Sequence, residues 1–238
     1  MLTTPTTTIP SAGPKTERRR SRWLRRIGRL AAGFVAFLVL GNLAILGASA
    51  WARQGRAETF GVPGVGNFQR LDDHVWRGKA PTTAGYRHLA ALGVTTIVDL
   101  RAESDIIDRE TLFAELGVEG VRLPIRDGQS PTADQVQQFL AVTRQSEGVV
   151  FVHCGAGVGR TGVMAAAYLV SSGQADGWSA MQENLAVGPP SLEQLAFAAR
   201  LDAADLSGDV ELDRPGPMVV ALSRTLDAPR RIWHNLGL

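Results

Sequence analysis

The sequence of 238 residues contains a single cysteine, Cys154, which excludes an intrachain disulfide framework and a metal site built from several cysteines. It also lacks an excess of basic residues in the part long enough to fold. Residues 1–56 carry ten basic residues and one acidic residue, whereas residues 57–238 carry 15 basic and 22 acidic residues. The formal charge of +2 therefore combines +9 and −7, and because the foldable part is acidic we expect no nucleic-acid partner.

Charged residues are absent from Leu30–Ala50, a run of 21 mostly apolar residues. A helix of this length rises about 30 Å, which matches the hydrocarbon core of a bilayer. Eight basic residues precede the run and only two follow it closely, a bias that keeps the N-terminus cytoplasmic. We therefore expect a disordered basic leader at residues 1–29, a single transmembrane anchor at residues 30–51 and an extracytoplasmic domain, which is periplasmic if the chain is bacterial.

A cleavable signal peptide is the alternative interpretation of the same run. Ala48 and Ala50 are small residues at the two positions that signal peptidase reads, and cleavage near Ala50 would yield a secreted protein. The apolar run is longer than the roughly 7–15 residues of a usual signal peptide, which favours the uncleaved anchor.

The remainder of the chain alternates strand-like and helix-like patterns, which predicts an α/β fold with a mostly parallel central sheet flanked by helices. We expect a linker at 52–67, one domain at 68–206 and an extension of unknown role at 207–238. The expected strands lie at about 68–76 (a hairpin around Asp72), 94–100, 120–125 and 148–153. The expected helices lie at about 82–92, 108–116, 132–145, 161–171, 175–186 and 192–206. Met218–Leu222 is too short to span a bilayer, so it either docks on the domain or lies at a membrane surface.

The segment after the strand that ends at His153 combines a cysteine, three glycines and an arginine. Glycines let consecutive backbone N–H groups point toward one place, and the following helix adds positive potential at its N-terminus. Arg160 can hold two phosphate oxygens with its planar guanidinium. A Cys154 thiolate among these donors is stabilised as a nucleophile, and Thr161 can hydrogen-bond it. The expected phosphate-binding residues are Gly155, Ala156, Gly157, Val158, Gly159 and Arg160.

Residues 153–162, HCGAGVGRTG, resemble the His-Cys-x5-Arg-Thr/Ser-Gly signature of the protein tyrosine and dual-specificity phosphatase superfamily. A Walker-type loop is excluded because no Gly-Lys-Ser/Thr ends the glycine-rich stretch. Two alternatives, a structural cysteine and a rhodanese-type sulfur transferase, would not explain the His-Cys start of the signature together with its Arg-Thr-Gly end. Val75–Pro81 (VWRGKAP) and the later TTIVDLR are also similar to compact dual-specificity-like phosphatases, especially bacterial ones, so the resemblance covers roughly Phe68–Leu201.

The resemblance implies a metal-independent enzyme without a cofactor that forms a phosphocysteine on Cys154. It implies a general acid on the loop that follows the preceding strand, which is Asp127, 27 residues before the cysteine. It also implies that His153 orders the loop. No Cys or His stands at ligand spacing from His153, so this residue does not read as a metal ligand.

Other assignments remain open for the acidic residues. Asp127 precedes a glycine and could instead be a simple turn residue. Asp105 and Asp108 are rival acids, although their positions at a helix start favour capping. Asp99 ends a strand and is expected to pair with an arginine.

The resemblance implies a phosphotyrosine or other phosphoprotein substrate. A lipid phosphate or another extracytoplasmic phosphomonoester is the alternative, and a non-catalytic phospho-binding module is a third possibility. Residues 155–159 supply no basic side chain, which argues against highly charged inositides. Arg126 either assists an anionic substrate or is solvated, and Gln194 either positions the hydrolytic water or lies on a helix surface.

Overall fold

The computed structural model describes residues 15–54, 61–102, 109–207 and 212–229. The chain divides into two units, residues 1–43 and 44–238, and each is described by itself. The helix α1 (Lys15–Ala52) is continuous, and its part from Trp23 to Ala52 is long and apolar enough to cross a membrane. This helix is compatible with a membrane anchor or with a signal sequence.

The start of α1 corrects one expectation. Residues 15–29 are helical, so the prediction of a disordered leader is wrong for this stretch, while residues 1–14 lie outside the described residues. Arginine and leucine are strong helix formers, and no proline interrupts residues 15–52. The basic run therefore continues into the apolar helix without a break.

The second unit contains a five-stranded sheet in the order β1-β2-β5-β3-β4. All neighbouring strands are parallel except β1 and β2, which form the expected antiparallel hairpin. The prediction of a mostly parallel sheet flanked by helices is confirmed. The strands are β1 (Gln69–Arg70), β2 (Val75–Lys79), β3 (Val94–Arg101), β4 (Glu119–Ile125) and β5 (Val149–Cys154).

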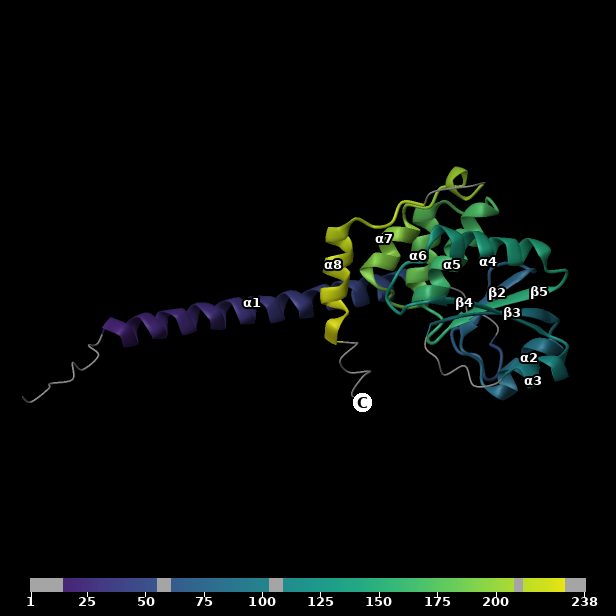
Figure 1. Ribbon diagram of the computed structural model, residues 1–238, viewed down its shortest axis with the longest axis horizontal. Helices are drawn as coiled ribbons and strands as arrows, with labels where there is room; N and C mark the ends of the chain where they lie inside the picture. The colour runs from purple at the N-terminus through teal and green to yellow at the C-terminus, as the bar shows by residue number, and fades with distance from the viewer. Residues whose placement is uncertain (1–14, 55–60, 103–108, 208–211, 230–238) are drawn as a thin grey trace, which may run out of the picture. The chain divides into compact units, whose positions relative to one another are not determined.

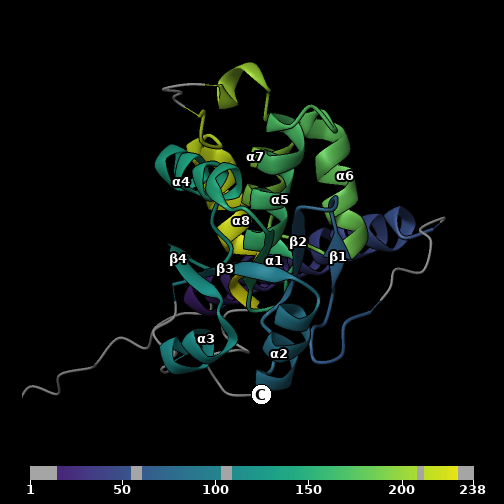
Figure 2. The same ribbon diagram turned by 90° about the vertical axis from the view of Figure 1, so that its right-hand side faces the viewer.

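Helices cover both faces of the sheet (Figures 1 and 2). One face carries α2 (Thr83–Ala91) and α3 (Glu110–Leu116). The other face carries α4 (Ala133–Gln145), α5 (Gly159–Ser171), α6 (Gly177–Val187) and α7 (Leu192–Ala198). Both faces of the sheet are thus buried, which explains why the sequences of β3 and β5 are almost continuously apolar.

The central strand β5 sends its side chains alternately into two apolar clusters. Val150, Val152 and Cys154 belong to the cluster under α4 and α5, whereas Phe151 belongs to the cluster that includes Tyr86 of α2. The alternation therefore places the side chains of the last two residues of β5 on opposite faces of the sheet. Cys154 faces the α5 side, and His153 faces the α2 side.

The end of the expected linker, residues 61–67, packs on the folded domain, while residues 55–60 lie outside the described residues. Val62 and Val65 are buried, and Gly64 lies against the backbone of Gly85 with a φ of +80°. The glycines that suggested flexibility instead permit this close approach. The folded part thus begins at least at Val62, earlier than the boundary expected at residue 68.

The C-terminal helices also differ from the expectation of one helix over residues 192–206. The helix α7 ends at Ala198, and a separate 3₁₀ turn covers Ala204–Leu206. A Cβ on Gly177 would contact the carbonyl oxygens of Ala198 and Leu201, so the chain turns where it packs closely on the start of α6.

The extension beyond residue 206 includes the helix α8 (Pro217–Leu226), which docks on the domain. The Ser223 hydroxyl accepts a hydrogen bond from the backbone N–H of Glu193 at 3.1 Å. Proline at the first position of α8 lacks only an N–H that a helix start leaves unbonded. Of the two alternatives for Met218–Leu222, docking on the domain is the one observed.

Candidate active site

The segment that carries Cys154 lies at the carboxyl edge of the parallel strands, where open α/β sheets bind ligands. The strand β5 ends at Cys154, and α5 begins at Gly159. Lys79 of β2 is the register partner of Cys154. We call residues 154–160 the cysteine loop.

Three successive carbonyl groups of the cysteine loop point outward, and each has a donor. Gly155 O accepts from the N–H of Ala80 at 3.3 Å, and Ala156 O accepts from Asn67 Nδ2 at 2.9 Å. Gly157 O accepts from Arg77 Nη2 at 2.8 Å. Because the peptide unit is planar, an outward carbonyl turns the next N–H inward.

One of these inward N–H groups, that of Gly157, points at the sulfur. Cys154 is 2% exposed, and the N–H of Gly157 points at Cys154 Sγ at 3.3 Å. Gly157 has a φ of +74°, and a Cβ there would collide with the backbone of Gly78 and Lys79. Only glycine fits this position, because a side chain would push the loop away from β2.

Arg77 and Asn67 are site residues that sequence reasoning missed. Arg77 is buried in β2 and also donates to Asn184 Oδ1 at 3.0 Å, which joins the cysteine loop to α6. Asn67 has a φ of +52°, uncommon for a residue other than glycine. An arginine between the apolar Trp76 and Gly78 of the strand was the available signal for Arg77, since buried charged groups need partners.

Arg160 and Asp127, two of the expected site residues, lie next to each other. Arg160 is almost fully buried, and its Nη1 donates to the carbonyl oxygen of Ile125 at 3.2 Å. Its Nη2 forms an ion pair with Asp127 Oδ1 at 3.2 Å, while the Asp127 side chain stays 65% exposed. The Arg160 side chain therefore reaches from the start of α5 to the end of β4, and the exposed Asp127 carboxylate lies beside its Nη2.

Thr161 is fully buried at the start of α5. Within the described residues its Oγ1 has no hydrogen-bond partner, so the predicted hydrogen bond to Cys154 is not formed in this structure. Asp105 and Asp108 lie outside the described residues. In the same described part of the chain, no group of three or more His, Cys, Asp or Glu side chains is placed to hold a metal ion.

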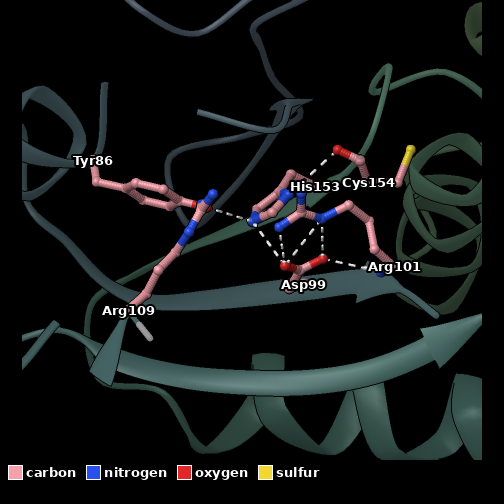
Figure 3. Close-up of polar contacts among 6 residues, drawn as sticks. All are labelled: Tyr86, Asp99, Arg101, Arg109, His153 and Cys154. Carbon is pink, nitrogen blue, oxygen red and sulfur yellow. Dashed lines mark hydrogen bonds and ion pairs between the residues drawn. The ribbon is translucent and has the colours of Figure 1, made fainter. Parts of the chain in front are cut away.

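His153 sits in a polar network on the α2 side of the sheet (Figure 3). Its Nδ1 lies 3.4 Å from the Cys154 carbonyl oxygen, and its Nε2 lies 3.1 Å from the Tyr86 hydroxyl. A carbonyl can only accept, so we assign the proton to Nδ1, and Nε2 then accepts from Tyr86. Tyr86 in turn accepts a hydrogen bond from Arg109.

Burial sets the pKa of His153, whereas hydrogen bonds set that of Asp99. It lowers the pKa of His153 from 6.5 to about 4, although the nearby Asp99 carboxylate opposes the shift. Burial would raise the pKa of Asp99, but the hydrogen bonds from Arg101 outweigh it and the pKa is lowered overall. Asp99 and Arg101 form an ion pair at 2.6 Å, as the sequence suggested. His153 is therefore neutral near pH 7.

The first turn of α7 holds the loop that carries Asp127, which we call the acid loop (residues 126–130). Ser191 Oγ donates to Gly128 O at 2.7 Å, and Gln194 Nε2 donates to Gln129 O at 3.1 Å. Glu193 Oε1 accepts from the backbone N–H and the hydroxyl of Ser130, both at 3.0 Å. Three consecutive residues of the acid loop are thereby fixed by one helical turn.

Gln194 also touches the cysteine loop. A Cβ on Gly159 would collide with its side-chain oxygen, and its Oε1 accepts from the backbone N–H of Ser191 at 3.1 Å. Gln194 is buried, so the helix-surface alternative is wrong. The side chain lies between the two loops, and the capping box of α7 sets its orientation.

The family model described as "DSP-PTPase phosphatase fused to NAD+ Kinase" matches residues 65–200. Probable NAD kinase 2 of Oryza sativa subsp. japonica is 36% identical over 110 residues, 43% of this chain and 11% of that protein. Dual specificity protein phosphatase CDC14A of Mus musculus is 39% identical over 77 residues, 32% of this chain and 12% of that protein. The chain thus spans about a tenth of these curated relatives.

Among solved structures, TpbA of P. aeruginosa has a TM-score of 0.52 at 23% identity, covering 63% of this chain and 92% of that chain. A second structure of TpbA, in complex with pTyr, has the same TM-score and coverage at 22% identity. At this level of identity the likeness shows a shared fold.

The shifted pKa of His153 makes stability depend on pH. Between about pH 6.5 and 4 the unfolded chain binds a proton that the folded chain does not, so the free energy of unfolding falls as pH falls. We expect a loss on the order of 3 kcal/mol from this residue by pH 4. Denaturant unfolding of the detergent-solubilised chain at pH 7, 5.5 and 4 measures it.

The substitution His153→Gln should remove this part of the pH dependence. His88→Gln, at an exposed histidine of α2, is the matched control. An equal slope in both variants would show that another group is responsible.

Proposed function

The chain belongs to the phosphatase family described as "DSP-PTPase phosphatase fused to NAD+ Kinase", within the protein tyrosine and dual-specificity phosphatase superfamily, and we propose that it hydrolyses phosphotyrosine and related phosphoprotein esters through a phosphocysteine on Cys154. The observation that carries this proposal is the convergence at one edge of the sheet. The sulfur faces the N–H of Gly157, and the loop ends in an arginine that pairs with Asp127.

The first step transfers the phosphoryl group to the protein. Cys154 Sγ attacks phosphorus in line, an S–P bond forms, and the P–O bond to the leaving oxygen breaks. The inward N–H groups of the cysteine loop and the Arg160 guanidinium hold the equatorial oxygens as charge moves onto them. Asp127 gives its proton to the leaving oxygen, which would otherwise depart as an alkoxide or phenoxide.

The second step releases phosphate. Asp127, now a carboxylate, takes a proton from water as the water attacks phosphorus and the P–S bond breaks. Thr161 Oγ1, buried beside the loop, is available to donate to the departing thiolate. Gln194 lies between the loops and holds the acid loop through Gln129 O, so its first role in this scheme is to position Asp127.

Neutral His153 contributes order rather than charge. Its Nδ1–H toward the Cys154 carbonyl fixes the peptide that begins the cysteine loop. Because burial keeps the pKa of His153 near 4, the positive charge at the site comes from Arg160 and the backbone dipoles. The proposal therefore predicts that His153 influences Cys154 Sγ only through the backbone of the cysteine loop.

Two features support the phosphoprotein substrate. TpbA, which shares the fold, has been crystallised with pTyr. The side chains of residues 155–159 offer no basic group for a polyphosphorylated head group. Among the alternatives, a lipid phosphate stands second, because α1 is long enough to anchor the chain in a bilayer.

The substitution Cys154→Ser should lower turnover of para-nitrophenyl phosphate by at least about 10³-fold, since the hydroxyl is a far weaker nucleophile. The variant should still bind tungstate, a phosphate analogue, by titration calorimetry. Full turnover by the variant would rule out the phosphocysteine. Loss of both turnover and binding with an unchanged melting temperature would instead indicate a binding role for the thiol.

The roles of Asp127 and of α7 are tested with leaving groups. Asp127→Asn should lower kcat/KM, which reports the steps through phosphoryl transfer to Cys154, by about 10²–10⁴-fold on phenyl phosphate, and by much less on para-nitrophenyl phosphate, whose leaving group needs little protonation. Ser191→Ala, which frees Gly128 O, should give the same pattern with a loss of up to about tenfold. Asp134→Asn on α4 is the control, and equal losses on both substrates would contradict general acid catalysis by Asp127.

We also propose that α1 anchors the chain with its catalytic domain outside the cytoplasm. After expression, the full-length chain should remain in membranes washed with alkaline carbonate, and added protease should reach the domain in cells stripped of their outer layers. Mass spectrometry of the purified chain tests cleavage. A mature N-terminus just after Ala50 would replace the anchor with a signal peptide.

A further inference from the structure

A pocket with a volume of about 380 Å³ lies beside the acid loop, and the proposed mechanism does not use it. Its walls come from the end of β4, the acid loop, the start of α4, the first turn of α7 and the C-terminal segment 212–229. The extension of unknown role therefore completes a concave surface next to the catalytic residues.

Three arginines line this pocket, Arg126 from the acid loop and Arg214 and Arg224 from the C-terminal segment. A single acidic residue, Glu193, lies among the lining residues. The formal charge of the lining is thus positive, although residues 57–238 as a whole carry −7. Guanidinium groups gathered around a concavity favour carboxylate or phosphate groups, which they can bind in a bidentate manner.

Glu193 belongs to the pocket wall and is largely shielded from a ligand. Its side chain is 6% exposed, and Oε1 accepts two hydrogen bonds from Ser130. Its Oε2 is buried as well. Arg126, Arg214 and Arg224 are all exposed, so the charge that a ligand meets in the pocket is positive. An acidic side chain supplies the matching anion.

The position of the pocket relates it to the phosphate site. Ile125 belongs to both places, because it lines the pocket and its carbonyl accepts from Arg160 Nη1. Arg126 lines the pocket, and the next residue is the general acid Asp127. Only the acid loop separates the two sites. Two to four residues of extended peptide span about 7 to 14 Å, enough to cross a single loop.

We propose that this pocket is a substrate subsite that binds an acidic side chain, glutamate or aspartate, two to four residues from the phosphorylated residue of a peptide. The proposal rests on the proposed function and names a sequence feature of its substrate. A peptide fits better than a lipid head group, because residues 155–159 carry no basic side chain for a highly charged head group, whereas a peptide carries its second anion on a separate residue that can reach the pocket.

The test compares pairs of phosphotyrosine peptides that carry glutamate or glutamine at each position from four residues before to four residues after the phosphotyrosine. With the full chain in detergent, kcat/KM should be about three- to tenfold higher for glutamate at one or more positions two to four residues away. Raising the salt concentration should shrink this ratio. The double variant Arg214→Gln, Arg224→Gln should bring the ratio close to one while turnover of para-nitrophenyl phosphate stays within about twofold.

Arg144→Gln, an exposed arginine near the end of α4 and outside the pocket, is the matched control and should keep the preference. A preference that is absent from the wild-type chain, or that persists in the double variant, overturns the subsite. If the double variant lost activity only toward anionic lipid phosphates in vesicles, the peptide subsite would also be overturned, in favour of a lipid ligand.

Separate measurements distinguish a failure of the subsite from a failure of the proposed function. Turnover of para-nitrophenyl phosphate by the wild-type chain reports the catalytic proposal alone. Binding of the paired peptides to the Cys154→Ser chain reports the subsite without turnover, and tighter binding of the glutamate peptide, lost in the double variant, supports it.

Discussion

The site depends on the outward orientation of the carbonyl groups at Gly155, Ala156 and Gly157. A loop cannot present its N–H groups to a sulfur unless the carbonyls on the opposite side find donors, since buried backbone groups without partners are costly. Ala80, Asn67 and Arg77 are those donors. Arg77 lies in β2, Ala80 follows it directly, and Asn67 precedes β1, so the hairpin beside the cysteine strand and the residues that flank it set the shape of the loop, and the glycines permit it.

The electrostatics follow from the same layout. The alternation of β5 places Cys154 on one face of the sheet and His153 on the other, in surroundings that keep the imidazole neutral. The guanidinium of Arg77 holds the loop from outside through Gly157 O, and the side chain of Arg160 reaches from α5 to the end of β4. Arg160 pairs with Asp127, so in the proposed mechanism the phosphate ligand and the general acid are neighbours before any substrate binds. In that mechanism a phosphate dianion competes with Asp127 for the Arg160 guanidinium.

The sequence predicted the features that are encoded locally. The strand that ends in His153-Cys154, the glycine pattern and Arg160 lie within twelve residues, and the mostly parallel sheet follows from the alternation of strands and helices. Sequence reasoning failed where partners are distant. Arg77 meets Gly157 80 residues later, and Ser191 meets Gly128 63 residues earlier. The segment Gly61–Gly66 looked like a linker because the same glycines serve flexibility and close packing, and only the partner Gly85 distinguishes them.

The docking of α8 on α7 orders the assembly of the site in time. The donors of the cysteine loop all precede Cys154 in the chain, so the nucleophile half can form from residues already synthesised. The acid loop instead waits for Ser191 and Glu193, and Glu193 in turn is contacted by Ser223. A polypeptide emerging from its N-terminus thus presents the donors of the cysteine loop first and the contacts of the acid loop last. In the proposed mechanism, leaving-group protonation then becomes available only when nearly all of the described chain has been made.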